Sequence, residues 1–150
     1  MSARVRAEDY RRAAGERVTE AGELRRAQRY TLAMYVAGVA AECMLRAYHR
    51  ADAAFDERHD VIELLKECNL DRLGEVAMTR LRAPVQTVHL LWSNSLRYFD
   101  ERRIRAYLKS MRQDRRGLQR GADFLKVRAK ELEDACLEIV TVGEDRWDRS

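Results

Sequence analysis

A chain of 150 residues with a formal net charge of +4 is long enough for one ordinary domain with its own hydrophobic core. Its three cysteines form no C-x-x-C pair and lie in apolar contexts, which argues against a disulfide framework and a zinc site. The N-terminus lacks the apolar core of a signal peptide, and the most apolar run, residues 30–45, is too short to span a membrane. We therefore expect a single cytoplasmic domain over residues 1–150, with a core at about 7–140 and no membrane partner.

The pattern of the first fifty residues predicts two helices. One proline, seven glycines and the lack of sustained period-two alternation already indicate a nearly all-helical chain. A first helix at about 7–27 is amphipathic, so its apolar stripe should lie on the core. A second helix at about 29–51 is apolar nearly all round, which is typical of a central helix or an oligomer interface. One polar ridge runs along it, formed by Thr31, Tyr35, Gly38, Glu42, Arg46 and His49.

Glu42 is the unexpected member of that ridge. An unpaired carboxylate in an apolar interior costs several kcal/mol, whereas an exposed pair with Arg46 one turn away contributes only about 0.3–0.5 kcal/mol. The position of Glu42 therefore needs a reason beyond a surface salt bridge.

The middle of the chain predicts a loop at 51–58, a short helix, a longer helix and a second loop. Asp60, followed three residues later by Glu63, is a capping-box pattern that starts the short helix. Residues 69–92 continue as helix, with Pro84 at a first turn or at a kink. Residues 93–101 look like a loop.

The stretch from Arg97 to Arg120 carries nine arginines and lysines against three carboxylates. Such an excess fits a solvated helix face or a phosphate-binding face, and the sequence leaves both open.

The last helix follows a heptad seam, which can serve a bundle core or a partner chain equally well. Glycines at 117 and 121 predict a break near residue 117, and the tail from Val142 is expected to fray. The seam consists of Leu118, Ala122, Leu125, Ala129, Leu132, Cys136 and Ile139.

Two stretches carry a family resemblance. "ELRRAQRYTLAMYVAGVAAECMLRAYHR", followed by "ERHDVIELL", resembles the HEPN domain, with its A-A-E helix and its H-D helix start. The tripeptide "LRY", residues 96–98, looks like the R-Y of many small prokaryotic members. The resemblance covers about residues 10–140. The matching positions are Tyr30, Ala33, Tyr35, Ala37, Gly38, Ala41, Glu42, Leu45, Arg46, Ala47, His59, Asp60 and Leu64.

The resemblance implies an all-α, four- or five-helix up-and-down bundle that commonly dimerises. Its family contains RNases, nucleotide-binding modules and partners of nucleotidyltransferases. We therefore expect a homodimer that binds RNA or a nucleotide, with a nucleotidyltransferase partner and a toxin–antitoxin or anti-phage role among the implied contexts. The alternative is a non-catalytic protein–protein interaction module whose arginines are only solvated. No cofactor is predicted.

In this reading Glu42 is a buried carboxylate that fixes how the helices dock. A structural pair without chemistry is the alternative explanation. The candidate cations are Arg46, His49, His59 and Arg97.

Catalytic members carry an arginine, four to six residues and then a histidine, and Arg82 and His89 offer such a pair. Seven helical steps place them on one face but about 10 Å apart along the axis, so a second chain would be required. Ala83 is apolar where active members are polar, and Pro84 stands between the pair. We therefore expect binding without cleavage. The other binding candidates are Arg97, Tyr98, Arg102, Arg103 and Arg105.

No other chemistry is well supported by the sequence. It contains no phosphate-cradling glycine loop, H-E-x-x-H or nucleophile elbow. The run "DERHD", residues 56–60, is a weak metal candidate because neighbouring residues of a loop and a helix cap seldom converge on one ion. No metal site is predicted.

Overall fold

A computed structural model describes residues 4–50 and 59–149, and within these ranges the regular structure is helical apart from one isolated bridge between His49 and Cys68. The all-α prediction is confirmed. The elements are α1 (Ala7–Arg26), α2 (Tyr30–Ala47), α3 (Val61–Lys66), α4 (Leu70–Leu91), the 3-10 helix η1 (Asn94–Tyr98), α5 (Glu101–Ser110) and α6 (Phe124–Trp147).

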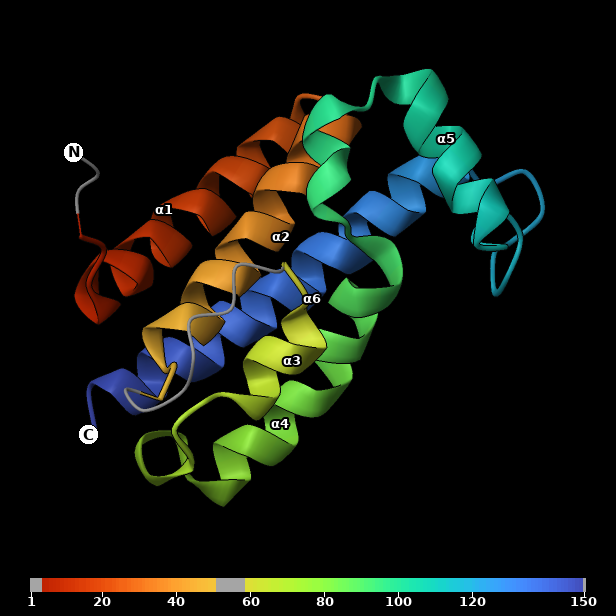
Figure 1. Ribbon diagram of the computed structural model, residues 1–150. Helices are drawn as coiled ribbons and strands as arrows, with labels where there is room; N and C mark the ends of the chain where they lie inside the picture. The colour runs from red at the N-terminus through yellow and green to blue at the C-terminus, as the bar shows by residue number, and fades with distance from the viewer. Residues whose placement is uncertain (1–3, 51–58, 150) are drawn as a thin grey trace.

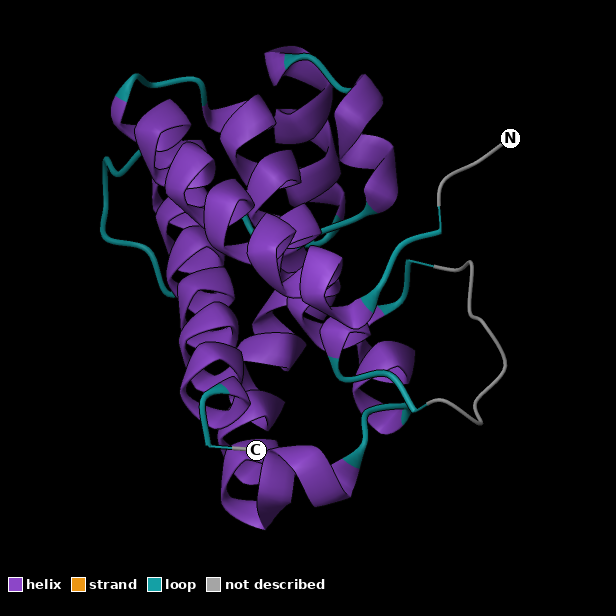
Figure 2. Ribbon diagram, turned by 90° about the vertical axis from the view of Figure 1, so that its left-hand side faces the viewer, coloured by secondary structure: helices purple, strands orange, loops and turns teal. Residues whose placement is uncertain are grey.

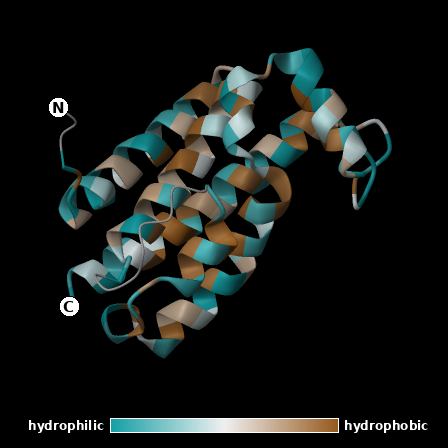
Figure 3. Ribbon diagram, viewed as in Figure 1, coloured by the Kyte–Doolittle hydropathy of each residue, from teal (hydrophilic) through white to brown (hydrophobic). Residues whose placement is uncertain are grey.

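The long helices α1, α2, α4 and α6 run alternately up and down in one elongated bundle (Figure 1). The second view shows the same helices side by side (Figure 2). Helix α2 is central, because it contacts α1, α6, α3, η1 and α5. The apolar residues of the long helices gather between them (Figure 3), so the core lies along the bundle axis.

Small residues allow α2 to pack closely against its neighbours. Its buried alanines include Ala37 and Ala41, and α1 presents Ala14 and Ala21. A Cβ atom on Gly38 would overlap the indole ring of Trp92, whose Nε1 donates a hydrogen bond to the Tyr35 carbonyl at 3.1 Å. Small side chains on α2 therefore set how closely η1 and its flanks approach.

Helix α4 bends at Gly74 and not at Pro84, which corrects the prediction of a first turn or kink at the proline. Gly74 has φ +81° and ψ 160°, a left-handed conformation that glycine adopts without a steric penalty. Pro84 lies inside the helix that restarts after this bend.

Two other predictions differ from the structure. Helix α2 ends at Ala47 and not near residue 51, because the chain pairs there with the segment before α4: Arg50 N–H donates to the Glu67 carbonyl at 2.9 Å. Residues 94–98 form a 3-10 helix and not an irregular loop, since Leu96 is buried in the core. The predicted loop at 51–58 lies outside the described residues.

The break predicted near residue 117 is present. Helix α5 ends at Ser110 and α6 begins at Phe124, and Gly117 and Gly121 both have positive φ in the connection between them. Leu118 and Ala122, the first two positions of the expected seam, therefore lie outside α6.

The C-terminal segment is helical to Trp147, so the prediction of a frayed tail from Val142 is wrong. Tyr48 explains the difference: its hydroxyl donates to the Gly143 carbonyl at 2.6 Å, and its ring meets Trp147 edge-on with centroids 5.6 Å apart. Burial raises the pKa of Tyr48 to about 12. Contacts with α2 thus hold the last turns of α6.

The two features that suggested a partner chain are both used within this chain. The apolar surface of α2 packs on α1, α6 and α3, and the seam of α6 is buried, with Leu125, Leu132 and Ile139 fully covered. Dimerisation therefore stays a prediction that these two patterns no longer motivate. Among the described helices, none is both long and apolar enough to cross a bilayer.

Candidate functional site

A buried ion cluster surrounds Glu42. Glu42 and Arg46 are each 8% exposed, and Arg46 Nε donates to Glu42 Oε1 at 3.0 Å. His59, which precedes α3, places its Nδ1 atom 2.7 and 2.8 Å from the two carboxylate oxygens of Glu42. Two basic side chains from two elements, Arg46 and His59, therefore meet one carboxylate, and both were among the candidates named from the sequence.

The contact with Glu42 fixes the orientation of the His59 ring. Because an ionised carboxylate only accepts hydrogen bonds, Nδ1 carries the proton and donates it. Nε2 is then left on the side of the ring away from Glu42, and the side chain of His59 is 40% exposed. This arrangement suits a histidine that accepts or releases a proton at Nε2.

The other two cations proposed for Glu42 lie elsewhere. His49 Nδ1 is 2.9 Å from the Arg50 carbonyl, beyond the end of α2, and Arg97 is exposed on η1 with its guanidinium 4.6 Å from the Tyr98 ring centroid. For His49 the reason is the early end of α2, which places this residue outside the helical ridge.

A cleft of about 360 Å³ opens beside His59, between α3 and the end of α4. His89 lines it, with Nδ1 3.9 Å from a carboxylate oxygen of Asp60, and Ser93 and Asn94 complete its polar wall. Asp60 also caps α3 by accepting from the Ile62 N–H at 3.0 Å, which confirms the predicted helix start. The fold thus brings two histidines, His59 and His89, to one cleft.

Arg82 does not share that cleft. Its side chain lines a separate cavity with Arg50, which follows α2, Lys66 at the end of α3, and Met78 of α4. Both Arg82 and His89 are exposed on the same helix, as the sequence predicted, but one chain does not bring them to one cavity. The composite arginine–histidine site stays a prediction that needs a second chain.

Arginines gather where η1, α5 and the connection 111–123 lie together at one end of the bundle (Figure 1). We call these elements the arginine-rich end. Its exposed arginines that form no carboxylate ion pair within 4.0 Å among the described residues are Arg97, Arg102, Arg103, Arg112, Arg116 and Arg120.

Arg105 of α5 and Arg128 of the adjoining helix α6 have structural partners. Arg105 Nη1 donates to Asp123 at 3.1 Å, and this contact with the cap of α6 lowers the pKa of the Asp123 carboxyl. Arg128 is 5% exposed and donates from Nε to the Gln113 carbonyl at 2.8 Å and from Nη2 to the Arg116 carbonyl. Arg105, a predicted binding residue, is therefore already committed to an ion pair.

Tyr98 stands beside the unpaired arginines with 76% of its surface exposed. Its neighbour Arg97 covers one face of the ring, and Arg103 lies 4.3 Å from the centroid of the Phe99 ring. Exposed aromatic rings next to guanidinium groups are the pattern on which unpaired bases stack.

The cysteines offer no nucleophile at neutral pH. All three are free thiols, and burial raises the pKa of Cys43 to about 11 and that of Cys68 to about 12. Among the described residues, no three His, Cys, Asp or Glu side chains converge in a way that could hold a metal ion. The sequence candidate at 56–60 lies mostly outside those residues.

Sequence reasoning missed Arg128 and the polar wall of the histidine cleft. Arg128 could have been found, because it falls one turn after Leu125 and beside Ala129 on the buried stripe of α6. A charged residue on such a stripe needs a partner. Ser93 and Asn94 carry no comparable pattern, since their place depends on how η1 packs.

Comparison with known proteins adds one finding. The family model of the HEPN domain matches residues 7–135, which is most of the chain and confirms the predicted resemblance. No curated protein and no solved structure matches the chain. The matched span contains the A-A-E helix with Glu42, the H-D start of α3, the arginine-rich end and the first half of α6, and the chain belongs to the HEPN domain family.

Proposed function

We propose that this HEPN protein binds single-stranded RNA at its arginine-rich end. The observation that carries the proposal is the set of exposed arginines there that lack a carboxylate partner within the described part of the chain. Unpaired guanidinium groups suit phosphate because they form two parallel hydrogen bonds to its oxygens. At the start of α1, by contrast, the exposed Arg12 donates to the Glu8 carboxylate.

The neighbouring rings favour a single strand over a duplex. Tyr98 is exposed and close to Arg97, and a base stacked on such a ring contributes about 1–3 kcal/mol. Stacking requires an unpaired base, because duplex bases already stack on each other. The anchored connection 111–123 supports the same reading, since Arg128 fixes the backbone that presents Arg112 and Arg116.

Fluorescence anisotropy with a labelled single-stranded RNA tests the proposal. The logarithm of the binding constant should fall linearly with the logarithm of the salt concentration, by about 0.7 per phosphate contact. Replacement of Arg102, Arg112 and Arg120 by Gln should weaken binding and reduce that slope.

The matched control removes the same number of positive charges at the far end of the bundle. Replacement of Arg4, Arg6 and Arg12 by Gln removes three exposed positive charges near the start of α1. It should leave the slope nearly unchanged. Equal loss in both variants would indicate a general charge effect, and salt-insensitive or absent binding would favour the protein–protein interaction module.

A second candidate function is metal-independent RNA cleavage, and the orientation of His59 by Glu42 favours it. One imidazole of the cleft would take the proton of a ribose 2′-hydroxyl while its oxygen bonds to phosphorus. The other, protonated, would give a proton to the 5′ oxygen as its bond to phosphorus breaks, leaving a 2′,3′-cyclic phosphate. Our expectation is binding without cleavage in EDTA. Cleavage by the wild type that is lost in His89→Ala would contradict this expectation and favour the RNase.

Assembly remains part of the proposal. We infer a homodimer from the family. Light scattering at tens of micromolar should report twice the chain mass, and a monomer would remove the composite Arg82/His89 site. A nucleotidyltransferase partner and a toxin–antitoxin or anti-phage role are further proposals that a neighbouring gene would support.

A further inference from the structure

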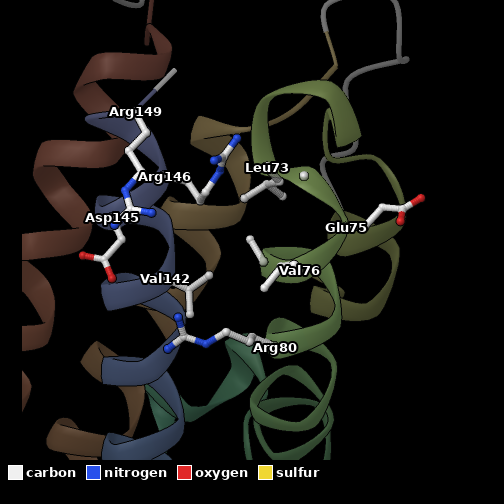
Figure 4. A pocket seen from close by; sticks show the side chains of 10 residues that line it. Leu73, Glu75, Val76, Arg80, Val142, Asp145, Arg146 and Arg149 are labelled. Carbon is white, nitrogen blue, oxygen red and sulfur yellow. The ribbon is translucent and has the colours of Figure 1, made fainter.

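A third cavity lies far from the arginine-rich end, between α4 just after its bend and the last turns of α6 (Figure 4). Its volume is about 390 Å³, which is within the range of small-molecule sites. Leu73, Val76 and Val142 turn their side chains toward the gap between the two helices and form an apolar floor. A ligand with a carbon body of modest size would fit this floor.

The rim of this cavity carries two guanidinium groups without a carboxylate partner. Arg146 Nη2 donates to the Arg72 carbonyl at 3.0 Å, while its Nε is buried and lacks a hydrogen-bond partner. Within the described ranges, neither Arg146 nor Arg149 has a carboxylate oxygen within 4.0 Å. Charged groups in a partly buried place are normally compensated, so Arg146 leaves positive charge to be neutralised, and the exposed Arg149 adds to that charge.

Nearby charges do not supply that compensation. Arg72 adds a third cation, with its guanidinium 4.3 Å from the Trp147 ring. Arg80 is already paired with Glu138 at 2.9 Å. The carboxylates of Glu75 and Asp145 border the cavity but point away from the gap between the helices (Figure 4).

We propose that this cavity binds a small organic phosphate. The phosphate would lie against Arg146 and Arg149, and the carbon body would cover Val76 and Val142. Two guanidinium groups fit a dianionic phosphate better than a single carboxylate, because each can present parallel N–H donors to its oxygens. Gly74 also lines the cavity, and its positive φ of +81° is a conformation that side chains rarely adopt.

This site is independent of the RNA surface. The two lie at opposite ends of α6, whose first turn meets α5 and whose last turns border the cavity (Figure 1). Either site can therefore fail without the other.

Methyl-labelled NMR titration of the full chain with phenyl phosphate tests the inference, with phenol and inorganic phosphate as comparison ligands. Phenyl phosphate should shift the methyl signals of Leu73, Val76 and Val142, and should bind at least about tenfold more tightly than phenol. Arg149→Gln and Arg146→Gln should each weaken binding by about tenfold.

Arg112→Gln, at the arginine-rich end, is the matched control and should not change the titration. Arg149 is exposed, so its variant keeps the test valid if Arg146→Gln fails to fold. Three results would overturn the inference: no methyl shift in the wild type at millimolar phenyl phosphate, equal binding of phenol, or weakening by Arg112→Gln and not by Arg149→Gln. The last result would move phosphate binding to the RNA surface.

Discussion

The polar ridge of α2 and the arginine-rich end differ in how their charged side chains are paired. At Glu42, a carboxylate meets an arginine and a histidine from two elements of the bundle, and each side chain has a partner. At the arginine-rich end, Arg102, Arg112 and Arg120 extend into solvent without a carboxylate. The difference separates charge that holds the helices together from charge that is free to meet a ligand.

Burial decides which of the two roles a charge takes. A buried ion without a partner costs several kcal/mol, so the fold must satisfy Glu42 internally. An exposed arginine keeps its hydration, so leaving it unpaired costs little free energy and its guanidinium group stays accessible to a phosphate. If this comparison is right, changes at α2 should alter stability, and changes at the arginine-rich end should alter binding.

The largest effect is expected for Glu42→Ala. Removal of the carboxylate takes away the Glu42 ion pair of the buried Arg46 and frees the His59 ring, so the free energy of unfolding should fall by about 3–5 kcal/mol. Urea unfolding measures this loss. Glu42→Gln should cost less, and Glu138→Ala, which removes an exposed pair with Arg80, should cost no more than about 1 kcal/mol. A melting temperature within a degree or two of wild type for Glu42→Ala would show that the cluster does not hold the helices.

Gly38→Ala should follow, with a loss of about 3 kcal/mol. The new methyl group would overlap the Trp92 ring, so the indole must shift and lose its hydrogen bond to the Tyr35 carbonyl. Urea unfolding gives the loss, and a red shift of tryptophan emission would report the moved ring. Gly15→Ala is the control, since a Cβ there has nothing within 4 Å. Equal stability of the two variants would mean that Trp92 is not tightly packed.

Arg128→Met links the two regions and should cost about 2 kcal/mol. It leaves the carbonyls of Gln113 and Arg116 without their donor and releases the connection 111–123 from α6. Trypsin should then cleave after Arg115 or Arg116 faster than in the wild type, and RNA binding should weaken. Arg105→Met, which breaks an exposed pair with Asp123, is the control and should change stability by less than about 1 kcal/mol. Unchanged proteolysis in Arg128→Met would show that other contacts fix the connection.

The smallest change in stability is expected where the change in binding is greatest. Each of Arg102→Gln, Arg112→Gln and Arg120→Gln should alter the free energy of unfolding by no more than about 0.5 kcal/mol, because these side chains are exposed and unpaired. Thermal unfolding of the combined variant measures this beside the RNA titration. A large loss of stability would mean that these arginines belong to the fold, and the comparison with α2 would no longer hold.

Local patterns in the sequence determined the main helices, the cap of α3 and the need of Glu42 for a partner. Periodicity placed α1, α2, α4 and α6, because an apolar stripe has to face a core. Asp60 began α3 because its side chain satisfies free amide groups of the first turn. Glu42 needed a cation for the same reason that any buried carboxylate does, and the sequence limited the choice to four residues.

Only the tertiary structure decided which of those four cations reach Glu42, because His59 arrives from another element and His49 turns away after the early end of α2. The same holds for the last turns of α6, which the composition suggested would fray but which Tyr48 and Trp147 hold through a contact across the bundle. The cavity beside Arg146 also depends on the bend at Gly74 and on the packing of α4 against α6. Sequence spacing predicts what one helix presents on each face, but contacts between helices depend on how all the elements pack together.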